Sequence, residues 1–265
     1  MAADAGTMLR QWRSQRSISQ LDLAYDVGVS PRHLSFVETG KSRPSPALLE
    51  ALSTRLDIPL RERNALLLAA GHAPRYSEES LDAAAMQRIR ASVQRILDAH
   101  DPNPGLALDR SWNVVLANDS AASLAALLPA HLQGPPFNVF RASLHPDGFA
   151  RMTENLDVWA AYLVDTLRRL VRITADPRLT AIEREVGEYS TVADLDRRAT
   201  RSAERSGEPA LLVPFVLRLG DDVLSFFTTL TTFGTPRDIT LEELTIELFY
   251  PADEATEDVV ARMQG

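Results

Sequence analysis

The cations that follow residue 40 have the simplest chemistry in the chain. Lys41, the only lysine, and Arg43 lie two residues apart in a segment rich in Gly, Ser and Pro that ends at Pro46. A cation in such a loop can bind a phosphate of a nucleic acid, and the alternative is a solvated loop. The elements that precede the loop decide between these readings.

Two short amphipathic helices are expected before this loop. Gly28 can adopt the left-handed backbone of a tight turn between them. Ser19 and Ser30 stand at N-cap positions, and Pro31 suits the first position of the second helix. Apolar residues recur at helical spacing, at Leu21, Leu23, Ala24, Val27, Val29, Leu34 and Val37. The spacing predicts a helix-turn-helix, a motif that places its second helix against DNA.

Further helices are expected on both sides of this pair. They cover about residues 8–16, 46–56 and 60–70, and the second of them is also opened by a Ser-Pro pair. Five short helices predict a compact all-α domain over residues 1–72.

The segment resembles the phage-repressor (Xre-type) helix-turn-helix family. The residues that carry the resemblance are Ser19-Gln20, Leu23-Ala24, Gly28-Val29-Ser30, Leu34-Ser35, Glu38, Gly40 and Pro44-Ser45. The resemblance implies binding to double-stranded DNA by the segment that begins at Ser30. It also implies that Arg13 and Glu38 pair with each other beneath the domain surface.

The resemblance further assigns roles in DNA binding to individual residues. Those implied to face the major groove or its edge are Pro31, Arg32, His33 and Phe36, and those implied to face phosphates are Gln20, Ser35, Lys41 and Arg43. Arg32 is the best candidate for reading a base, because a guanidinium can bond O6 and N7 of guanine at once. Phe36 could touch a thymine methyl group or pack back onto the domain.

Charge divides the chain in the same place. Residues 1–76 contain ten Lys and Arg against seven Asp and Glu, a net charge of +3. The remaining residues carry a net charge of −11, which gives the total of −8. Basic charge is therefore concentrated in the segment expected to bind DNA.

Composition excludes several other classes. The absence of cysteine removes disulfides and thiolate metal sites, and the five histidines form no pair at ligand spacing, so no metal site or cofactor is expected. No apolar run approaches the roughly 18 residues of a membrane helix, and the N-terminus is not a signal peptide, which favours a cytoplasmic protein. No catalytic motif is present, so an enzyme is not expected and no catalytic residue is assigned.

Residues 73–80 form a polar linker, and the pattern changes beyond it. A helix over residues 81–99 is followed by two β-like runs, GLALD and WNVVLAN, that meet at Arg110-Ser111. Residues 149–189 are helical by period, and three β-rich segments follow at 210–219, 223–233 and 244–251. We expect residues 81–265 to form an α+β domain with a five-stranded antiparallel sheet, helices packed on one face and an enclosed pocket.

This second part resembles the MmyB-like ligand-binding domain, a PAS-related sensor that follows an Xre-type helix-turn-helix. The resemblance rests on RERNALLLAAGHAP at 61–74, the WNVVLAN run, NVFRASLHPDGF at 138–149, and residues 224–253. It implies a small apolar or fatty-acyl-like effector held between sheet and helices, and a homodimer on a palindromic operator.

Candidate ligand-binding residues fall in three places. Trp159 and Leu163 share a helix face, although such a stripe alone is more often core packing. Phe226 and Phe227 point to opposite faces of one strand, and alternation does not tell which is inward. Polar anchors for a carboxylate are sought near Phe140, at Arg141, His145 and Asn155. The alternatives are that Arg141 pairs with an acidic residue and that His145 caps a turn.

Together these observations predict a ligand-responsive transcription regulator whose dimer reads two half-sites about one helical turn apart. In the alternative, the C-terminal domain only dimerises or binds a protein partner. A core filled by side chains would favour that alternative, and a continuous apolar cavity would count against it.

Overall fold

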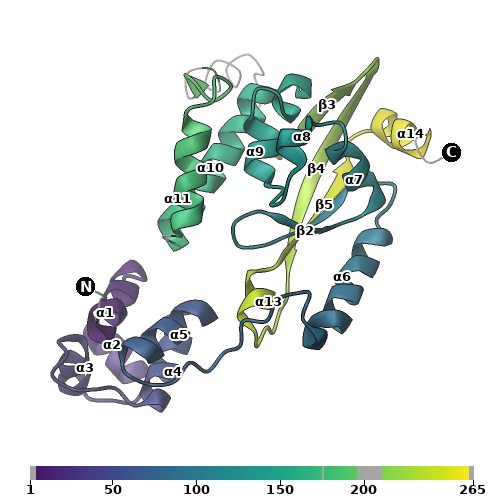
Figure 1. The fold of residues 1–265 in the computed structure, drawn as a ribbon. Coiled ribbons are helices and arrows are strands. Elements are labelled where there is room, and N and C mark those ends of the chain that lie inside the picture. Colours follow the sequence, from purple (N-terminus) through teal and green to yellow (C-terminus); the bar gives the residue numbers. More distant parts are fainter. Residues whose placement is uncertain (1–3, 175, 196–197, 199–210, 263–265) are drawn as a thin grey trace. The chain divides into compact units, whose positions relative to one another are not determined.

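The computed structural model describes residues 4–174, 176–195, 198 and 211–262. The chain divides into two compact units (Figure 1). The first unit contains residues 1–85 together with 233–242, and the second contains 86–232 and 243–265. The first unit therefore extends beyond the boundary expected at residue 72 and takes in a segment from the last third of the sequence.

Five helices form the N-terminal part of the first unit. They are α1 (Ala5–Gln15), α2 (Gln20–Asp26), α3 (Pro31–Glu38), α4 (Pro46–Arg55) and α5 (Leu60–Ala69). The hydroxyls of Ser19, Ser30 and Ser45 each accept a backbone N–H of the helix that follows, as N-caps do. Gly28 has φ of +72°, which ends α2 in the left-handed conformation. The expected all-α helix-turn-helix domain is confirmed.

A core of small aliphatic side chains holds these helices together. The cluster joins every helix of the domain through residues that include Leu9, Leu23, Leu34, Leu52 and Leu66, each at most 1% exposed. Because all five helices have between seven and eleven residues, this burial rather than helix propensity stabilises them.

The segment 233–242 joins the first unit through hydrogen bonds. The Asp238 carboxylate accepts the Ser77 hydroxyl at 2.7 Å and the Glu79 N–H at 3.1 Å, and the Ile239 N–H bonds the Ser77 carbonyl at 2.9 Å. The Glu242 carboxylate accepts the N–H of Leu60 at the start of α5, at 2.7 Å. This segment leads into the short helix α13 (Ile239–Glu243).

The second unit is built on a five-stranded antiparallel sheet. Its strands are β1 (Gly105–Leu108), β2 (Val114–Ala117), β3 (Phe215–Leu219), β4 (Asp222–Thr232) and β5 (Thr245–Pro251), in the order β2-β1-β5-β4-β3. The predicted number and direction of strands are confirmed. The third strand begins at Phe215 rather than residue 210, and Ala210 lies outside the described residues.

Helices of the second unit surround this sheet. The α-helices are α6 (Gln87–Asp98), α7 (Asp119–Ala125), α8 (Ala130–Gln133), α9 (Val139–Leu144), α10 (Leu156–Thr174), α11 (Pro177–Gly187) and α14 (Glu254–Arg262). Two 3-10 turns accompany them, η2 (Phe149–Met152) and η1 (Ala84–Met86), which spans the boundary between the two units. The helix expected over 81–99 begins only at Gln87, after a turn closed by the Ala83 N–H and the Ser80 carbonyl.

The expectation that helices pack on one face of the sheet is wrong. Trp159 of α10 stacks on Phe215 of β3 at 4.9 Å on one face. On the other face, a Cβ at Gly105 would lie 3.2 Å from the side chains of both Leu97 of α6 and Leu248 of β5. Figure 1 shows α10 and α6 on opposite sides of the strands. Apolar residues occur on both faces of β5, so both faces of the strand must be shielded from water.

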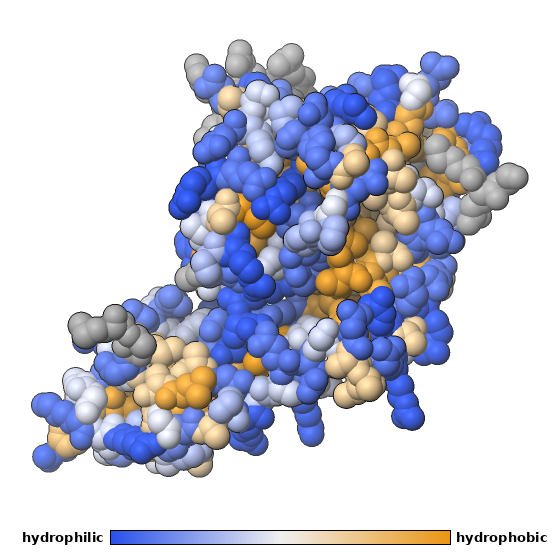
Figure 2. All heavy atoms as spheres, in the orientation of Figure 1, coloured by the Kyte–Doolittle hydropathy of each residue, from blue (hydrophilic) through white to orange (hydrophobic). Residues whose placement is uncertain are grey.

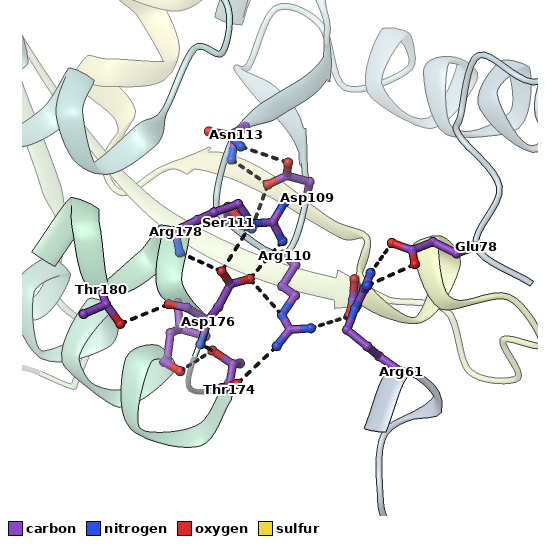
Figure 3. Close-up of polar contacts among 12 residues, drawn as sticks. Arg61, Glu78, Asp109, Arg110, Ser111, Asn113, Thr174, Asp176, Arg178 and Thr180 are labelled. Carbon is purple, nitrogen blue, oxygen red and sulfur yellow. Dashed lines mark hydrogen bonds and ion pairs between the residues drawn. The ribbon is translucent and has the colours of Figure 1, made fainter. Parts of the chain in front are cut away.

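The turn between β1 and β2 is tied to three other elements by Arg110 (Figure 3). Its guanidinium bonds the Thr174 carbonyl at 3.2 Å and pairs with Asp176 at 3.3 Å and Glu243 at 3.1 Å. Burial alone would raise the pKa of Asp176, but hydrogen bonds and charges from Arg178 and Arg110 outweigh it and lower that pKa. The network joins the C-terminal end of α10, the N-cap of α11 and the last residue of α13 to the hairpin.

Candidate nucleic-acid interface and ligand cavity

The exposed side of α3 carries cations around one aromatic ring. The Arg32 guanidinium lies 5.4 Å and the Lys41 ammonium 5.9 Å from the centroid of the Phe36 ring. Phe36 is 36% exposed and is absent from the core of the domain. The ring therefore supports two cations on the surface, which is a third possibility beside the two considered from the sequence.

The loop after α3 is held close to that helix. The N–H groups of Lys41 and Ser42 both bond the Phe36 carbonyl, at 2.8 and 3.1 Å. Pro31 occupies the first turn, Ser30 caps the His33 N–H, and Ser35 receives the Thr39 hydroxyl on its carbonyl at 2.7 Å. Backbone hydrogen bonds thus place Arg32 and Lys41 on the same surface.

A buried carboxylate anchors α3 to α1 and α2. Glu38 accepts Arg13 Nε at 2.7 Å and Nη2 at 3.0 Å, and Gln20 Nε2 at 2.9 Å. Hydrogen bonding to Glu38 raises the pKa of Arg13 above its ordinary value. The predicted Arg13–Glu38 pair is confirmed. Gln20, expected at a phosphate, donates its amide to Glu38.

Arg43 has a different environment from Lys41. Its Nε donates to the Ala70 carbonyl and its Nη2 to the Gly71 carbonyl, each at 2.5 Å, so it closes the C-terminal end of α5. Lys41 is exposed and contacts the Phe36 ring. The sequence placed both cations at phosphates, but local patterns do not reveal that Arg43 reaches residues 27 and 28 positions further along the chain.

The second unit contains a small apolar cavity of about 60 Å³ and a groove of about 1060 Å³. Of the candidate ligand-binding residues, Trp159 and Leu163 line the cavity and Phe226 lines the groove. Pro104 and Leu124 line both spaces, so the cavity and the groove lie next to each other. Figure 2 shows apolar atoms exposed on the second unit near α7 and α14, two of the elements that border the groove.

Aromatic rings make up much of the cavity wall. Phe215 lies 4.9 Å from Trp159, 6.3 Å from Phe149 and 6.1 Å from Phe249, measured between ring centroids. Glu247 is the one acidic residue among the lining residues and is only 3% exposed. The sequence analysis missed Glu247, although its position two residues before Phe249 places both on one face of β5.

Phe227 does not join this wall. It stacks on Tyr250 at 5.3 Å, on the face of the sheet opposite to Phe226, which is buried in the core. Phe140 is also buried, and it stacks on Trp112 at 4.8 Å rather than lining either space.

The polar anchors expected from the sequence have other partners. Arg141 forms an ion pair with Glu185, with Nη2 2.7 Å from Oε2, which confirms the alternative of an acidic partner. This hydrogen bond lowers the pKa of Glu185 and raises that of Arg141. Asn155 donates to the Pro214 carbonyl and accepts the Val216 N–H, so it holds the start of β3.

His145 accepts the Asp147 N–H on Nδ1 at 3.1 Å, which confirms a turn-capping role. Its ring also contacts His131 and Tyr189, at 5.4 and 4.9 Å. Within the described part of the chain, His131, His145 and Asp147 form a group whose possible metal-ligand atoms lie within 4.8 Å of one another. Local spacing does not predict this group, because His131 and His145 are fourteen positions apart. The His145 hydrogen bond occupies one of its two ring nitrogens.

A helix-turn-helix with a cationic surface, joined to a domain with an apolar cavity, defines a ligand-regulated DNA-binding transcription regulator. Residues 89–263 match the family model described as the MmyB-like transcription regulator ligand binding domain, and residues 9–63 match one described as helix-turn-helix. The first match covers more than half of the chain, which therefore belongs to the family of MmyB-like transcription regulator ligand binding domains.

Both family models describe regulatory domains, and neither describes an enzyme. No curated protein matches the chain. Among the described residues, no helix is long and apolar enough to cross a membrane.

Proposed function

We propose that this regulator binds a palindromic operator as a homodimer, reads bases through Arg32, and responds to a small, largely apolar effector held in the second unit. The observation that carries the DNA-binding part is the pair of cations around Phe36 on the exposed side of α3. A guanidinium at this position can bond guanine, while an ammonium beside it can bind phosphate.

The apolar cavity and its groove support the effector part of the proposal. The lining of the cavity is almost entirely apolar, and Pro104 and Leu124 line both the cavity and the adjoining groove. Ligand sites in proteins share this character, with few polar groups among aromatic and aliphatic side chains. A domain that only dimerised would need no such space, so the cavity counts against that alternative.

Enrichment of operator sequences from random duplex DNA tests the DNA-binding part. The wild-type chain should select a two-fold symmetric sequence whose half-sites lie about 10 base pairs apart. Arg32→Ala should bind the selected operator about 1 to 3 kcal/mol more weakly and accept changes at one base position in each half-site.

Arg88→Ala is the matched control, because it removes the same charge from an exposed position in α6 of the second unit. Its affinity and base preference should equal those of the wild type. If Arg32→Ala bound the operator as tightly and selectively as this control, Arg32 would not read bases as proposed.

Native mass spectrometry of the purified chain tests the effector part. A mass excess that disappears on denaturation would identify a co-purified small molecule in the protein. A clean apoprotein mass, together with no thermal shift from the apolar probes described below, would support a domain that only dimerises or binds a protein.

A further inference from the structure

Glu247 is an acidic side chain in the middle of a buried sheet face. It lies on the central strand β5, paired with Leu106 of β1 and Leu230 of β4. Burial raises its pKa to about 7, and a hydrogen bond with the Thr228 side chain only partly opposes this effect. Its Oε2 atom has no hydrogen-bond partner among the described residues. A buried carboxyl with one unsatisfied oxygen costs folding free energy, so its presence needs a reason.

Trp159 of α10 carries an unsatisfied donor, where Glu247 carries an unsatisfied acceptor. Its ring packs against Phe215 and Tyr162, yet the buried Nε1–H has no acceptor within the described part of the chain. Trp159 and Glu247 both line the 60 Å³ cavity, whose other lining side chains are apolar apart from Ser143. The two residues that carry an unused donor and an unused carboxyl oxygen thus both line one apolar space.

We propose that Glu247 and Trp159 hold the hydroxyl group of an otherwise apolar alcohol, whose chain extends toward the groove past Pro104 and Leu124. A hydroxyl oxygen can accept the indole N–H while its own proton is donated to Glu247. An ammonium group has no acceptor for the indole. A carboxylate would bring a second negative charge to Glu247, unless Glu247 keeps its proton.

This assignment rests on the proposed effector function, but it makes a narrower claim about the effector. The sequence pointed to a carboxylate held by Arg141, whereas Arg141 pairs with Glu185. The polar groups of the cavity itself therefore favour an alcohol over a fatty-acid anion.

The test compares three probes of one chain length, 1-decanol, decanoate and decylamine, by calorimetric titration of the full chain at pH 8. Decanol should bind most tightly. Trp159→Phe keeps an aromatic ring and removes the N–H, so it should weaken decanol about tenfold. Phe227→Leu alters an aromatic residue on the other sheet face and should leave decanol affinity unchanged.

The pH dependence of decanoate binding provides a second test. Its affinity should rise about fivefold from pH 8 to pH 7, because it requires protonated Glu247, and this dependence should vanish in Glu247→Gln. Tyr162 of α10 is the other titratable group that interacts with this carboxyl, and burial raises its pKa, so it stays neutral over this range.

The outcomes separate the two proposals. Decanoate binding as tightly as decanol at pH 8, or decanol affinity unaffected by Trp159→Phe, would overturn the alcohol assignment and leave effector sensing intact. Failure of all three probes, with no co-purified molecule, would mean that water alone fills the cavity and would overturn both.

Discussion

At the scale of single residues, Glu247 destabilises the fold, because its carboxyl is buried beside apolar rings. The unfolded chain releases this proton near the ordinary pKa of 4.5, whereas the folded chain holds it until about pH 7. The folded state therefore loses stability as pH rises from about 4.5 to 7, and the loss is complete above that range.

Glu247→Gln should remove this loss. We expect the variant to gain on the order of 2 kcal/mol over wild type between pH 5 and pH 8, somewhat less than the shift implies because the amide also needs partners. Urea unfolding at several pH values measures this difference. Glu188→Gln, at an exposed position of the same unit, is the control and should show no such gain. A constant difference between Glu247→Gln and wild type across this range would contradict the buried-carboxyl assignment.

Lys41 and Arg43 should separate DNA binding from stability. Lys41→Ala should lower the slope of log K against log salt by about 1 without changing the unfolding free energy. Arg43→Ala should cost about 1 to 3 kcal/mol of stability, because two carbonyls at the end of α5 lose a charged donor. Operator titrations at several salt concentrations, paired with urea unfolding, distinguish the two. Equal effects of both variants on stability would show that Arg43 does not cap α5 in solution.

At the scale of elements, the connection between β4 and β5 stands out. Both strands belong to the second unit, but residues 233–242 between them belong to the first. The chain therefore crosses between the units at both ends of this segment, in addition to the crossing after Ala85. Asp238 fixes this segment, because it accepts hydrogen bonds from Ser77, Glu79 and the N-terminus of α13.

Asp238→Ala should release this segment from the first unit. The amides of Glu79 and Ile239 should then exchange with solvent at least tenfold faster, which hydrogen exchange detected by mass spectrometry measures. Asp221→Ala, in the turn between β3 and β4, is a matched control that should leave both amides protected. Unchanged protection in Asp238→Ala would show that this carboxylate does not hold the segment.

At the scale of the whole molecule, charge separates the parts. The first 76 positions carry a net charge of +3 and the remainder −11, so operator affinity should fall steeply with salt although the chain has a net charge of −8.

The proposed homodimer makes a separate prediction. Light scattering should give twice the chain mass for the free protein, and titration should give two chains per operator. One chain per operator at saturation would contradict the proposed homodimer.

Much of the fold follows from local patterns. The serine N-caps and Gly28 mark helix ends of the first unit, and short runs rich in apolar, aromatic and β-branched residues mark the five strands of the second. Such features depend on residues within a few positions of one another, which is why the sequence alone determines them.

The sequence by itself therefore determined the helix-turn-helix, the five-stranded sheet and the basic segment that carries Arg32. Only the tertiary structure decided that Arg43 caps α5, that Phe226 rather than Phe227 faces the core, and that Glu247 shares a cavity with Trp159. The reason is physical: hydrogen-bond partners and solvent exclusion depend on which distant segments pack together. Periodicity assigns a residue to a face, but it does not tell what covers that face.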